Sequence, residues 1–321
     1  MKNILITGGA GFIGSNLAVY LKKNNFNIYI LDDLSVGKKN NLEGLKVKLI
    51  KKNINQINRI KFGVNFFAVI HLAALAEILI PPHKEKKYYE SNVSGLQEVL
   101  NFSVINKVKK FIFASSASVY GDTKSKRVNE KFQLEPNHFY AYTKFIGEKM
   151  IENYLRINKI NYTILRFFNV YGVKSNAVVA KFIAQKIQKK KITIFGNGKQ
   201  KRDFIHVDDL NNVIKLILNS KLKNQIFNVG SGKAESIINL KKIISKENDH
   251  IFLNKRNDDI EISISNITKV KKKLGWKPKR KFDESVLEIE KYDKNRLKKI
   301  NLPTIIDQIQ LIKKFNNKLK K

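Results

Sequence analysis

A run of glycines between a strand-like and a helix-like segment is the feature that most constrains this chain: Thr7–Gly14 reads Thr-Gly-Gly-Ala-Gly-Phe-Ile-Gly. It follows an apolar segment, Lys2–Thr7, and opens a segment with helical spacing, Phe12–Lys23. Glycines so placed permit a tight bend, close approach of the backbone to a pyrophosphate, and close helix–strand packing. A diphosphate then lies at the positive N-terminus of the helix. The predicted contacts on this turn are Gly8, Gly11, Phe12, Ile13 and Gly14.

Apolar runs rich in Ile, Val and Phe alternate with segments of helical period through the first half of the chain. The predicted strands are Lys2–Thr7, Asn27–Leu31, Phe67–Leu72, Lys110–Ser115 and Tyr162–Arg166. The predicted helices are Phe12–Lys23, Lys86–Asn106 and Phe139–Asn158. This alternation is typical of the α/β class, in the form of a doubly wound, Rossmann-type parallel sheet with helices on both faces.

After about Val173 the alternation loosens, and we expect a smaller mixed α/β domain there. A helical stretch, Val178–Lys189, is followed by short strands and by turn residues such as Gly196-Asn197-Gly198. The predicted division is a dinucleotide-binding domain over 1–172, to which 204–230 returns, and a substrate domain over most of 173–321. The helical spacing of the last apolar residues predicts a docked terminal helix rather than a membrane anchor; these residues are Ile305, Ile309, Ile312 and Leu319.

The second predicted strand ends in Leu31-Asp32-Asp33, and Asp32 lies 18 residues past Gly14. At this position a carboxylate accepts hydrogen bonds from the hydroxyls of an adenosine ribose. Two adjacent acids would repel a 2′-phosphate, and no arginine follows to neutralise it. The sequence therefore predicts NAD rather than NADP as the cofactor.

A tyrosine and a lysine stand four residues apart in Tyr140-Ala141-Tyr142-Thr143-Lys144, on one face of a predicted helix. A phenol with its ordinary pKa near 10 is a poor base, and lowering this pKa by ~3 units requires ~4 kcal/mol of preferential phenolate stabilisation. We expect Lys144 and a positively charged nicotinamide to supply it together in a dry site. Upstream, the serine-rich segment Ala114–Gly121 ends a strand, so its hydroxyls lie at the carboxyl edge of the sheet, where ligands bind.

With these three elements the chain resembles the extended short-chain dehydrogenases/reductases, and among them the NAD-dependent nucleotide-sugar epimerases and dehydratases. The resemblance extends from Met1 to about Val286. Further matching segments are Leu31–Gly37, His71–Ala74, Asn92-Val93, Arg166–Gly172, Arg202–Asp209 and Leu274–Trp276.

The resemblance implies a role for each matching residue. Tyr140 would be the base, Lys144 would bind the nicotinamide ribose, and Ser116 would hydrogen-bond the reacting hydroxyl. The implied cofactor contacts beyond the glycine turn are Asp32, Asp33, Ser35, Asn53, Ile54, Leu72, Ala73, Ala74, Asn92 and Lys144. The implied substrate contacts are Ser116, Ser118, Tyr140, Asn169, Arg202, Arg256, Asp259 and Ser263, and no metal is implied. The implied partners are a nucleoside-diphosphate sugar, expected to be a UDP-hexose, and a second copy of the chain, paired through Lys86–Asn106 and Phe139–Asn158.

Two of the chain's eight arginines, Arg202 and Arg256, stand at implied substrate positions in a sequence that otherwise uses lysine as its cation. A diphosphate favours the planar, bidentate guanidinium, which lysine cannot imitate. The residue types therefore support the assignment of these two arginines to a diphosphate.

Departures from the family pattern narrow the expected reaction. The 4,6-dehydratases carry an Asp-Glu pair directly after the catalytic hydroxyl residue, and the decarboxylases carry a glutamate at the second of these positions. Here the two positions hold Ala117 and Ser118, which cannot transfer the required proton. The pattern that remains is 4-epimerisation of a UDP-hexose through a transient 4-keto sugar and bound NADH. The alternative is another nucleotide-sugar reaction on the same scaffold: UDP-glucuronate 4-epimerisation, a keto-sugar reduction or, less expected, 4,6-dehydration or decarboxylation.

Three other departures concern binding. Asn53 replaces an aspartate near the adenine, and its amide oxygen can still accept a hydrogen bond. Asp258 replaces a glycine and adds negative charge near the diphosphate. Ser263 stands where some epimerases use a bulky tyrosine to exclude N-acetyl groups, so N-acetylhexosamine substrates are admissible.

Composition limits the remaining classes. The chain carries 62 Lys and Arg against 27 Asp and Glu, a formal net charge of +35, so a nucleic-acid-binding scaffold is the non-enzyme alternative. Lysine dominates and is scattered over all segments, which favours a solvated surface without a specific nucleic-acid partner. The five histidines have no metal-ligand spacing, and we expect His138 to be a helix-entry residue, with contact to substrate as the alternative. No cysteine and no apolar run of membrane-spanning length are present, so we expect a cytoplasmic enzyme that is not bound to membranes.

Overall fold

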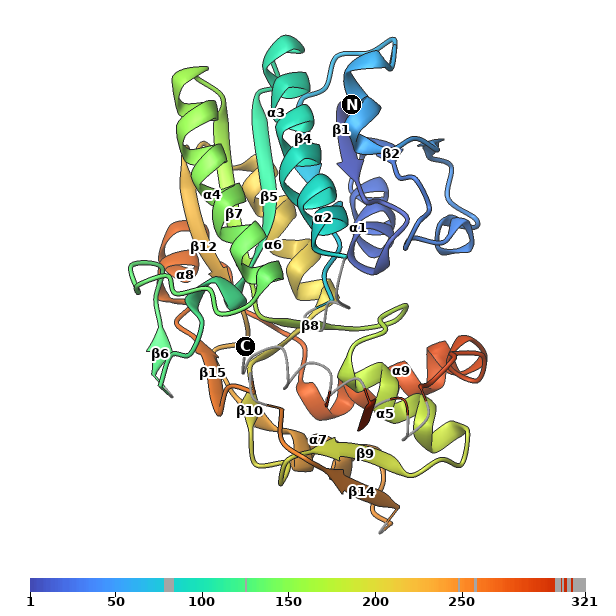
Figure 1. Cartoon of the computed structure of the whole chain (residues 1–321). Helices are drawn as coiled ribbons and strands as arrows, with labels where there is room; N and C mark the ends of the chain where they lie inside the picture. The colour runs from blue at the N-terminus through green and yellow to red at the C-terminus, as the bar shows by residue number, and fades with distance from the viewer. Residues whose placement is uncertain are drawn as a thin grey trace.

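The computed structural model describes residues 1–77, 84–124, 126–247, 249–256 and 259–303, together with residues 307, 309, 310 and 313. A seven-stranded, parallel sheet forms the larger domain, in the order β12-β7-β5-β4-β1-β2-β3 (Figure 1). Its strands are β1 (Lys2–Thr7), β2 (Phe26–Leu31), β3 (Lys48–Ile50), β4 (Ala68–His71), β5 (Lys110–Ser116), β7 (Asn161–Phe167) and β12 (Gln225–Val229). The strand order reverses between β1 and β4, and in such sheets a ligand crevice opens at the carboxyl ends of these strands.

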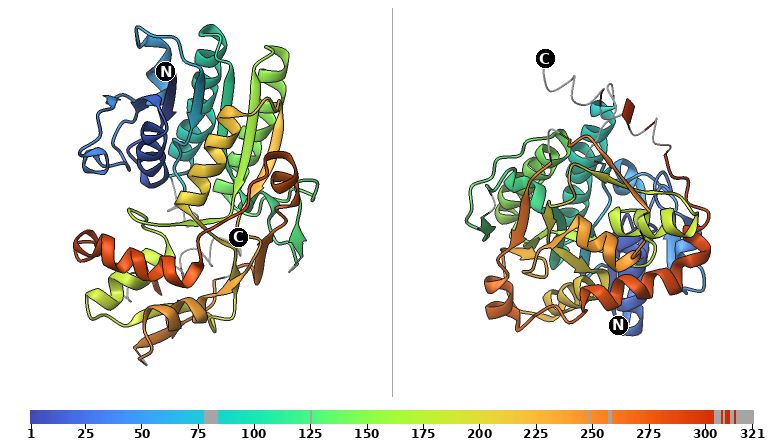
Figure 2. Two further views of the ribbon diagram at one scale, coloured as in Figure 1. Left: turned by 180° about the vertical axis from the view of Figure 1, so that it is seen from behind. Right: turned by 90° about the horizontal axis from the view of Figure 1, so that it is seen from below.

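Helices cover both faces of this sheet, as the α/β pattern predicts (Figures 1 and 2). One face carries α1 (Phe12–Lys23) and α6 (Val207–Asn219); the other carries α2 (Glu85–Tyr89), α3 (Gly95–Ile105) and α4 (Phe139–Ile157). Successive residues of β1 divide between the two cores: Ile4 and Ile6 pack under α1 and α6, whereas Leu5 packs under α3 and α4. Because the middle of β1 is buried on both faces, Ile4, Leu5 and Ile6 form a continuous apolar run.

The predicted elements of the first half are confirmed to within one residue at each end, with one exception. The predicted helix Lys86–Asn106 is divided, because a π-helical turn, Glu90–Ser94, separates α2 from α3. A π-turn inserts one residue into the helical repeat. Here the inserted turn carries the buried Asn92, whose side chain binds both backbone groups of Leu75 in the loop after β4.

The smaller domain lies beyond the carboxyl edge of the large sheet (Figure 1). Its core contains Phe182, Ile194, Leu240 and Ile289, contributed by three helices and a strand. The helices are α5 (Val178–Ile187), α7 (Ile237–Ile244) and α9 (Phe282–Leu297). The strands are the parallel pairs β9 (Ile192–Phe195) with β14 (His250–Leu253) and β8 (Asn169–Tyr171) with β11 (Phe204–His206), and the sheet β13 (Glu235–Ser236), β10 (Lys201–Arg202), β15 (Ile262–Ser265) and β6 (Arg127–Val128).

Two later segments pack on the larger domain. β12 is an edge strand of the large sheet and pairs with β7. Helix α8 (Thr268–Leu274) contacts β12, and Val270 and Trp276 join the core under α1 and α6. The chain therefore crosses between the two domains several times, which places residues distant in sequence side by side at their border.

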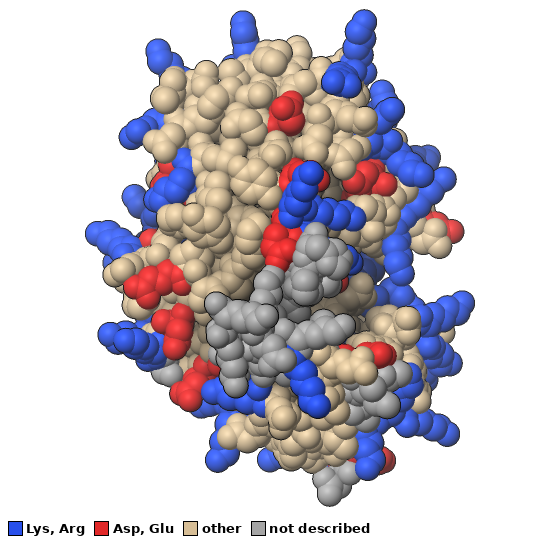
Figure 3. Space-filling view, in the orientation of Figure 1, with Lys and Arg blue, Asp and Glu red and all other residues tan. Residues whose placement is uncertain are grey.

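Figure 3 shows Lys and Arg side chains mostly around the outline of the visible face, with uncharged areas and several Asp and Glu side chains between them and no single dominant basic patch. Across the described residues, the helices are all too short or too polar to traverse a bilayer. The predicted terminal helix falls on residues that lie mostly outside the described ones.

Candidate active site

The glycine turn between β1 and α1 has the shape that a dinucleotide requires. Gly8 has a φ of +70°, and a Cβ there would lie 2.6 Å from the backbone nitrogen of Ala73. A Cβ at Gly14 would overlap the carbonyl oxygen of Gly8, whereas a Cβ at Gly11 would meet only that oxygen, at 3.3 Å. Helix α1 begins after Gly11 without a side-chain cap, so the N–H groups of its first turn, at Phe12 and Ile13, point into the crevice. These backbone groups fit a pyrophosphate.

Asp32 lies at the end of β2, below the glycine turn. Its Oδ1 accepts a hydrogen bond from the N–H of Leu34 at 2.8 Å, and its Oδ2 accepts one from the N–H of Ala10 at 2.9 Å. Burial raises the pKa of this carboxyl, while the two N–H groups act in the opposite direction. Each carboxylate oxygen can accept a second hydrogen bond, so Asp32 both shapes the loop and fits a ribose diol.

Asp33 holds the neighbouring predicted contacts together. It accepts hydrogen bonds from the N–H and hydroxyl of Ser35 and from the amide of Asn53, the last at 2.8 Å. Burial raises the pKa of Asp33, but these hydrogen bonds outweigh burial and the pKa is lowered. The side-chain oxygen of Asn53 also accepts from the N–H of Asn55 and so begins a short 3-10 helix at the buried Ile54. A contact of Asn53 or Ile54 with the adenine stays a prediction.

The loop after β4 forms the far wall of the crevice and contains Leu72, Ala73 and Ala74, of which Leu72 donates its N–H to the carbonyl of Thr7 at 3.1 Å. Asn92 holds this loop: in addition to its two bonds with Leu75, its amide donates to the Thr143 hydroxyl at 3.0 Å. Both N–H bonds of the Asn92 amide are therefore used within the protein. Asn92 positions the cofactor loop against α4, the helix that carries the catalytic pair.

The predicted catalytic residues are brought together where β5 ends against the first turns of α4. The hydroxyls of Tyr140 and Ser116 are hydrogen-bonded to each other, and Ser116 also accepts from the Ser118 hydroxyl at 2.8 Å. The Lys144 ammonium donates to the carbonyl of Ala114 at 2.7 Å, and the side chain is 4% exposed. Burial lowers the pKa of Lys144 to about 7.

Burial dominates the electrostatics of Tyr140. It raises the pKa of Tyr140 to about 12, although the hydrogen bond from Ser116 lowers it. The expected joint effect of Lys144 and an oxidised nicotinamide on the phenol pKa stays a prediction. A phenolate at this position depends on the positive charge that an oxidised nicotinamide supplies when it is bound.

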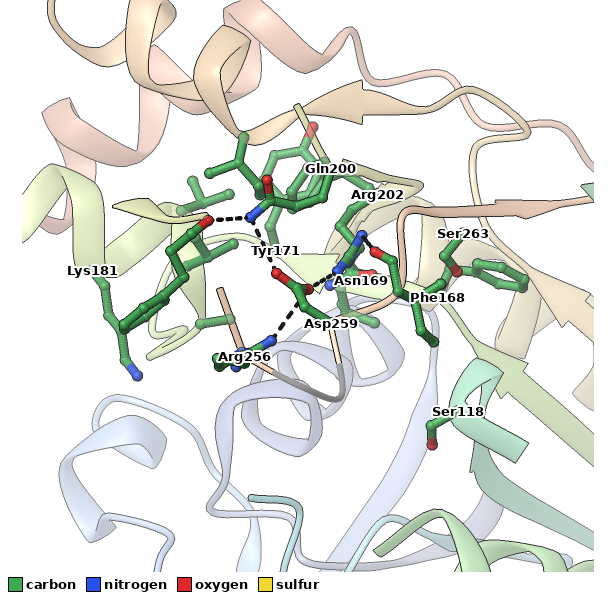
Figure 4. Close-up of a pocket in the computed structure, with 18 of the residues that line it drawn as sticks. Ser118, Phe168, Asn169, Tyr171, Lys181, Gln200, Arg202, Arg256, Asp259 and Ser263 are labelled. Atoms are coloured by element: carbon green, nitrogen blue, oxygen red, sulfur yellow. Dashed lines mark hydrogen bonds and ion pairs between the residues drawn. The ribbon is translucent and has the colours of Figure 1, made fainter. Parts of the chain in front are cut away.

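A cavity of about 510 Å³ opens beside the Ser116–Tyr140 pair, at the border of the two domains. Seven of the eight implied substrate residues line it: Ser116, Ser118, Asn169, Arg202, Arg256, Asp259 and Ser263. The eighth, Tyr140, is not among the lining residues, but it is hydrogen-bonded to Ser116, which is. In Figure 4, Ser118 stands apart from the cluster of Arg202, Arg256 and Asp259.

Asp259 organises the basic part of the cavity. Its Oδ1 accepts hydrogen bonds from both guanidinium groups, that of Arg202 and, at 3.5 Å, that of Arg256 (Figure 4). Its Oδ2 accepts from the amide of Gln200 at 3.3 Å. Arg202 is held further by the carbonyl of Ile260 at 2.7 Å. The two guanidinium groups therefore converge on one anion, in the arrangement that a diphosphate would use. The other predicted departure in this segment, Asp258, lies outside the described residues.

Several cavity residues were not predicted from the sequence. Lys181 and Phe182 of α5 belong to an amphipathic helix whose apolar residues predict only core packing, and Phe195 and Gln200 flank a turn. The sequence offered one indication of these residues: Gln200 lies two positions before the predicted substrate contact Arg202. His138 is a helix-entry residue as expected, because its Nδ1 accepts from the N–H of Ala141 at the start of α4. It also lines the cavity, and its contact with substrate stays a prediction. Nowhere in the described chain do three His, Cys, Asp or Glu side chains converge in a way that could bind a metal ion.

Comparison with known proteins decides the family. The model of the NAD dependent epimerase/dehydratase family matches residues 4–230. The chain belongs to this family. Its cofactor is accordingly NAD, and the Rossmann-type architecture agrees with that of the family's solved members.

Three relatives illustrate the range within the family. UDP-glucose 4-epimerase from Thermotoga maritima, solved with UDP-glucose, matches with a TM-score of 0.87 and 32% identity over 92% of this chain and 100% of that one. UDP-N-acetylglucosamine 4-epimerase from Methanobrevibacter ruminantium, solved with UDP-N-acetylmuramic acid, matches with a TM-score of 0.83 and 30% identity over 92% and 99%. The dTDP-D-glucose 4,6-dehydratase of Dictyostelium discoideum is 33% identical over 76% of this chain and 62% of that protein. Because epimerases and a dehydratase are equally similar, identity alone does not select the reaction.

Proposed function

We propose that this enzyme inverts C4 of a UDP-hexose, either the UDP-glucose/UDP-galactose pair or the corresponding N-acetylhexosamines. One arrangement supports the proposal. The bonded hydroxyls of Ser116 and Tyr140 adjoin a cavity of about 510 Å³, and in another part of the same cavity Arg202 and Arg256 converge on Asp259. A substrate that is held by its diphosphate at the arginines can present its sugar to the hydroxyl pair.

The residues divide the proposed chemistry between them. Tyr140 takes the proton of the 4-hydroxyl at its phenolic oxygen, and Ser116 hydrogen-bonds the same hydroxyl. NAD, which the glycine turn and Asp32 would hold, would supply the hydride acceptor for C4 and, once reduced, the hydride donor. Lys144, 2.7 Å from the Ala114 carbonyl, keeps an ammonium near the phenol. Inversion requires the sugar to turn between the two hydride transfers, and arginines that grip only the diphosphate permit this rotation.

Dehydration and decarboxylation would need an acidic side chain in the cavity beside Ser116, and the described lining residues provide none there. Ala117 and Ser118 occupy the positions that carry the acids in those enzymes, and the Ser118 hydroxyl is bonded to Ser116. Among the described residues that line the cavity, the one carboxylate is Asp259, which is paired with Arg202. An acid engaged in this ion pair is not placed to remove water from the sugar.

A neutral hexose suits the cavity better than a uronate. The described residues from the β5 end and the start of α4 that line it offer hydroxyls, an amide and an imidazole: Ser116, Ser118, Asn137 and His138. A sugar carboxylate would be most stable against a guanidinium or ammonium. The described basic side chains of the cavity, Lys181, Arg202 and Arg256, come from the smaller domain instead.

The test is to incubate the NAD-loaded protein separately with UDP-glucose, UDP-N-acetylglucosamine and UDP-glucuronate and to follow the sugars by proton NMR. We expect the 4-epimer of at least one of the first two. A 4-keto-6-deoxy product would identify a dehydratase, and conversion of UDP-glucuronate alone would identify the uronate epimerase. If no nucleotide sugar is converted although NAD is bound, the proposal fails.

A further inference from the structure

Glu148 is a buried carboxylate on α4, one helical turn after Lys144, and the proposed reaction assigns it no step. It is 0% exposed, so its charge requires a counter-ion and hydrogen bonds. Arg166 of β7 supplies both, with Nη2 at 2.7 Å from Oε2 and Nε at 3.0 Å from Oε1. The Ser115 hydroxyl donates a further hydrogen bond to Oε1 at 2.5 Å.

Ser115 stands between the two groups that hold the catalytic pair. The carbonyl of Ala114 accepts from the Lys144 ammonium, and the hydroxyl of Ser116 bonds Tyr140. Because these three residues are consecutive at the end of β5, whatever holds Ser115 also sets where its neighbours lie. The bond from Ser115 to Glu148 ties this strand end to the helix that carries both catalytic residues.

Arg166 is itself immobilised, so Glu148 has a fixed partner. Its Nη1 donates to the Tyr120 hydroxyl at 2.9 Å and to the carbonyl of Glu130 at 3.1 Å. The Tyr120 hydroxyl in turn donates to the side-chain oxygen of Asn228, on the edge strand β12, at 2.6 Å. The network thus links β5, α4, β7 and β12 behind the catalytic pair.

The charged and titratable groups that face Lys144 are few. Its ammonium lies 4.9 Å from the ring centroid of Phe113, against which His71 of β4 is stacked. Burial, together with the charge of Lys144, lowers the pKa of His71 to about 3, so this ring is neutral. Tyr140 lies on the same helix, with Tyr88 of α2 close to it. Burial lowers the pKa of Lys144, and Glu148 opposes this effect.

We propose that Glu148 is a positioning residue of the active site: its bond to Ser115 sets the catalytic helix against the end of β5, and its carboxylate, one helical turn from Lys144, favours the ammonium form of that lysine beside Tyr140. The proposal rests on the proposed roles of Tyr140 and Lys144. It adds a residue that acts through them without touching the substrate.

Two variants separate the two parts of this role. Glu148→Gln removes the charge but retains an oxygen for Ser115, whereas Ser115→Ala removes the bond but retains the charge. We expect Glu148→Gln to move the basic limb of the pH profile of kcat about 1 unit lower, because Lys144 loses its proton more readily, and to lower kcat at pH 8 about 10-fold. Ser115→Ala is expected to lower kcat about 3-fold with the limb unmoved. The control is Glu152→Gln, which lies one turn further along α4 and is paired with Lys149 at the surface; it should change neither quantity.

Glu148→Gln leaves Arg166 buried beside a neutral partner, which endangers folding. The same measurements are therefore made on Glu148→Gln/Arg166→Gln, in which both buried charges are absent. A second readout needs no turnover: the phenolate absorbance of the NAD-loaded protein, minus that of its Tyr140→Phe counterpart, reports the pKa of Tyr140. We expect the pKa of Tyr140 to rise in Glu148→Gln and in Glu148→Gln/Arg166→Gln, and to stay unchanged in Glu152→Gln.

The two readouts distinguish the two proposals. If the wild-type protein converts no UDP-hexose but its phenolate titration depends on Glu148, the proposed function fails and the positioning role stands. If a folded, NAD-loaded variant without the Glu148 charge keeps the wild-type titration and pH profile, the positioning role is overturned.

Discussion

The glycine crevice and the substrate cavity are built from different materials. In the crevice the essential groups belong to the backbone. They are Gly8 with its left-handed conformation, the tightly packed Gly14 and the N–H groups at the start of α1, all at the turn between β1 and α1. In the cavity they are side chains from distant segments, such as Ser116, Arg202 and Asp259. The backbone shape that fits the cofactor therefore tolerates almost no substitution. Sugar specificity, in contrast, can change through substitution of single side chains in the cavity.

The largest effect is expected where the two regions meet. Tyr140→Phe removes the proton acceptor while retaining the ring, so kcat should fall by about 10²–10⁴-fold with NAD still bound. The measurements are turnover of the active UDP-hexose by NMR and the NAD content of the denatured protein. Tyr142→Phe, two residues along the same helix and 51% exposed, is the matched control and should retain activity. Loss of NAD together with activity in Tyr140→Phe would show that the two regions are not separable in this way.

A methyl group in the crevice should abolish cofactor binding. Gly8→Ala combines a φ of +70° with a Cβ only 2.6 Å from the nitrogen of Ala73, and we expect it to lower the free energy of unfolding by about 2–4 kcal/mol and to remove NAD. Gly44→Ala has a similar φ, +74°, with nothing within 4 Å of the added Cβ, so it isolates the backbone strain at about 1 kcal/mol. Urea unfolding and NAD content measure both. Equal destabilisation in the two variants would contradict the close-approach argument.

A change in the cavity should affect the substrate and spare the cofactor. Arg202→Lys keeps the charge but loses the fork that now binds Asp259 and the carbonyl of Ile260. We expect the KM of the UDP-hexose to rise about 10–100-fold, as expected for one charge-assisted pair, with NAD affinity unchanged. Steady-state kinetics and NAD titration test this, with the exposed Arg127→Lys as control. An unchanged KM would remove Arg202 from the substrate contacts.

The smallest effect concerns acid stability in the wall between the regions. The pKa of His71 falls from 6.5 to about 3 in the folded protein, and its Nδ1 lies 2.8 Å from the Thr7 hydroxyl. The unfolded chain therefore binds a proton that the folded protein rejects, so stability is lost as the pH falls from 6.5 towards 3. His71→Asn should flatten this loss by about 1–3 kcal/mol in urea unfolding at pH 4 and pH 7. An unchanged slope in His71→Asn would contradict the assignment.

The crevice could be predicted because its information is local. Gly8, Gly14 and Asp32 lie within one strand–helix–strand unit, and the apolar periods of that unit predicted the bounds of β1 and α1. The division of the helix at Glu90–Ser94 could not be predicted, because a π-turn follows from the tertiary bonds of Asn92 and not from periodicity. The hydrogen bonds that Asp32 accepts from the N–H groups of Ala10 and Leu34 could not be predicted either, because they depend on how the two loops fold against each other.

The cavity was predicted less completely. Its residues were named through the family resemblance, and spacing alone would not have joined Asp259 to Arg202, which are 57 positions apart. Lys181 and Phe182 were missed because a residue that faces a cavity has the same helical period as one that faces a core. The burial that raises the pKa of Tyr140 could not be predicted from the sequence, because desolvation depends on the packing of the whole site.

The central claim, that C4 is oxidised and then reduced at the same carbon, is tested most directly with a UDP-hexose deuterated at C4. Converted in ordinary water by the NAD-loaded protein, it should yield the 4-epimer with deuterium retained at C4, as read by proton and deuterium NMR. Deuterium recovered at C6 of a 4-keto-6-deoxy sugar, or washed out into the solvent, would contradict the account.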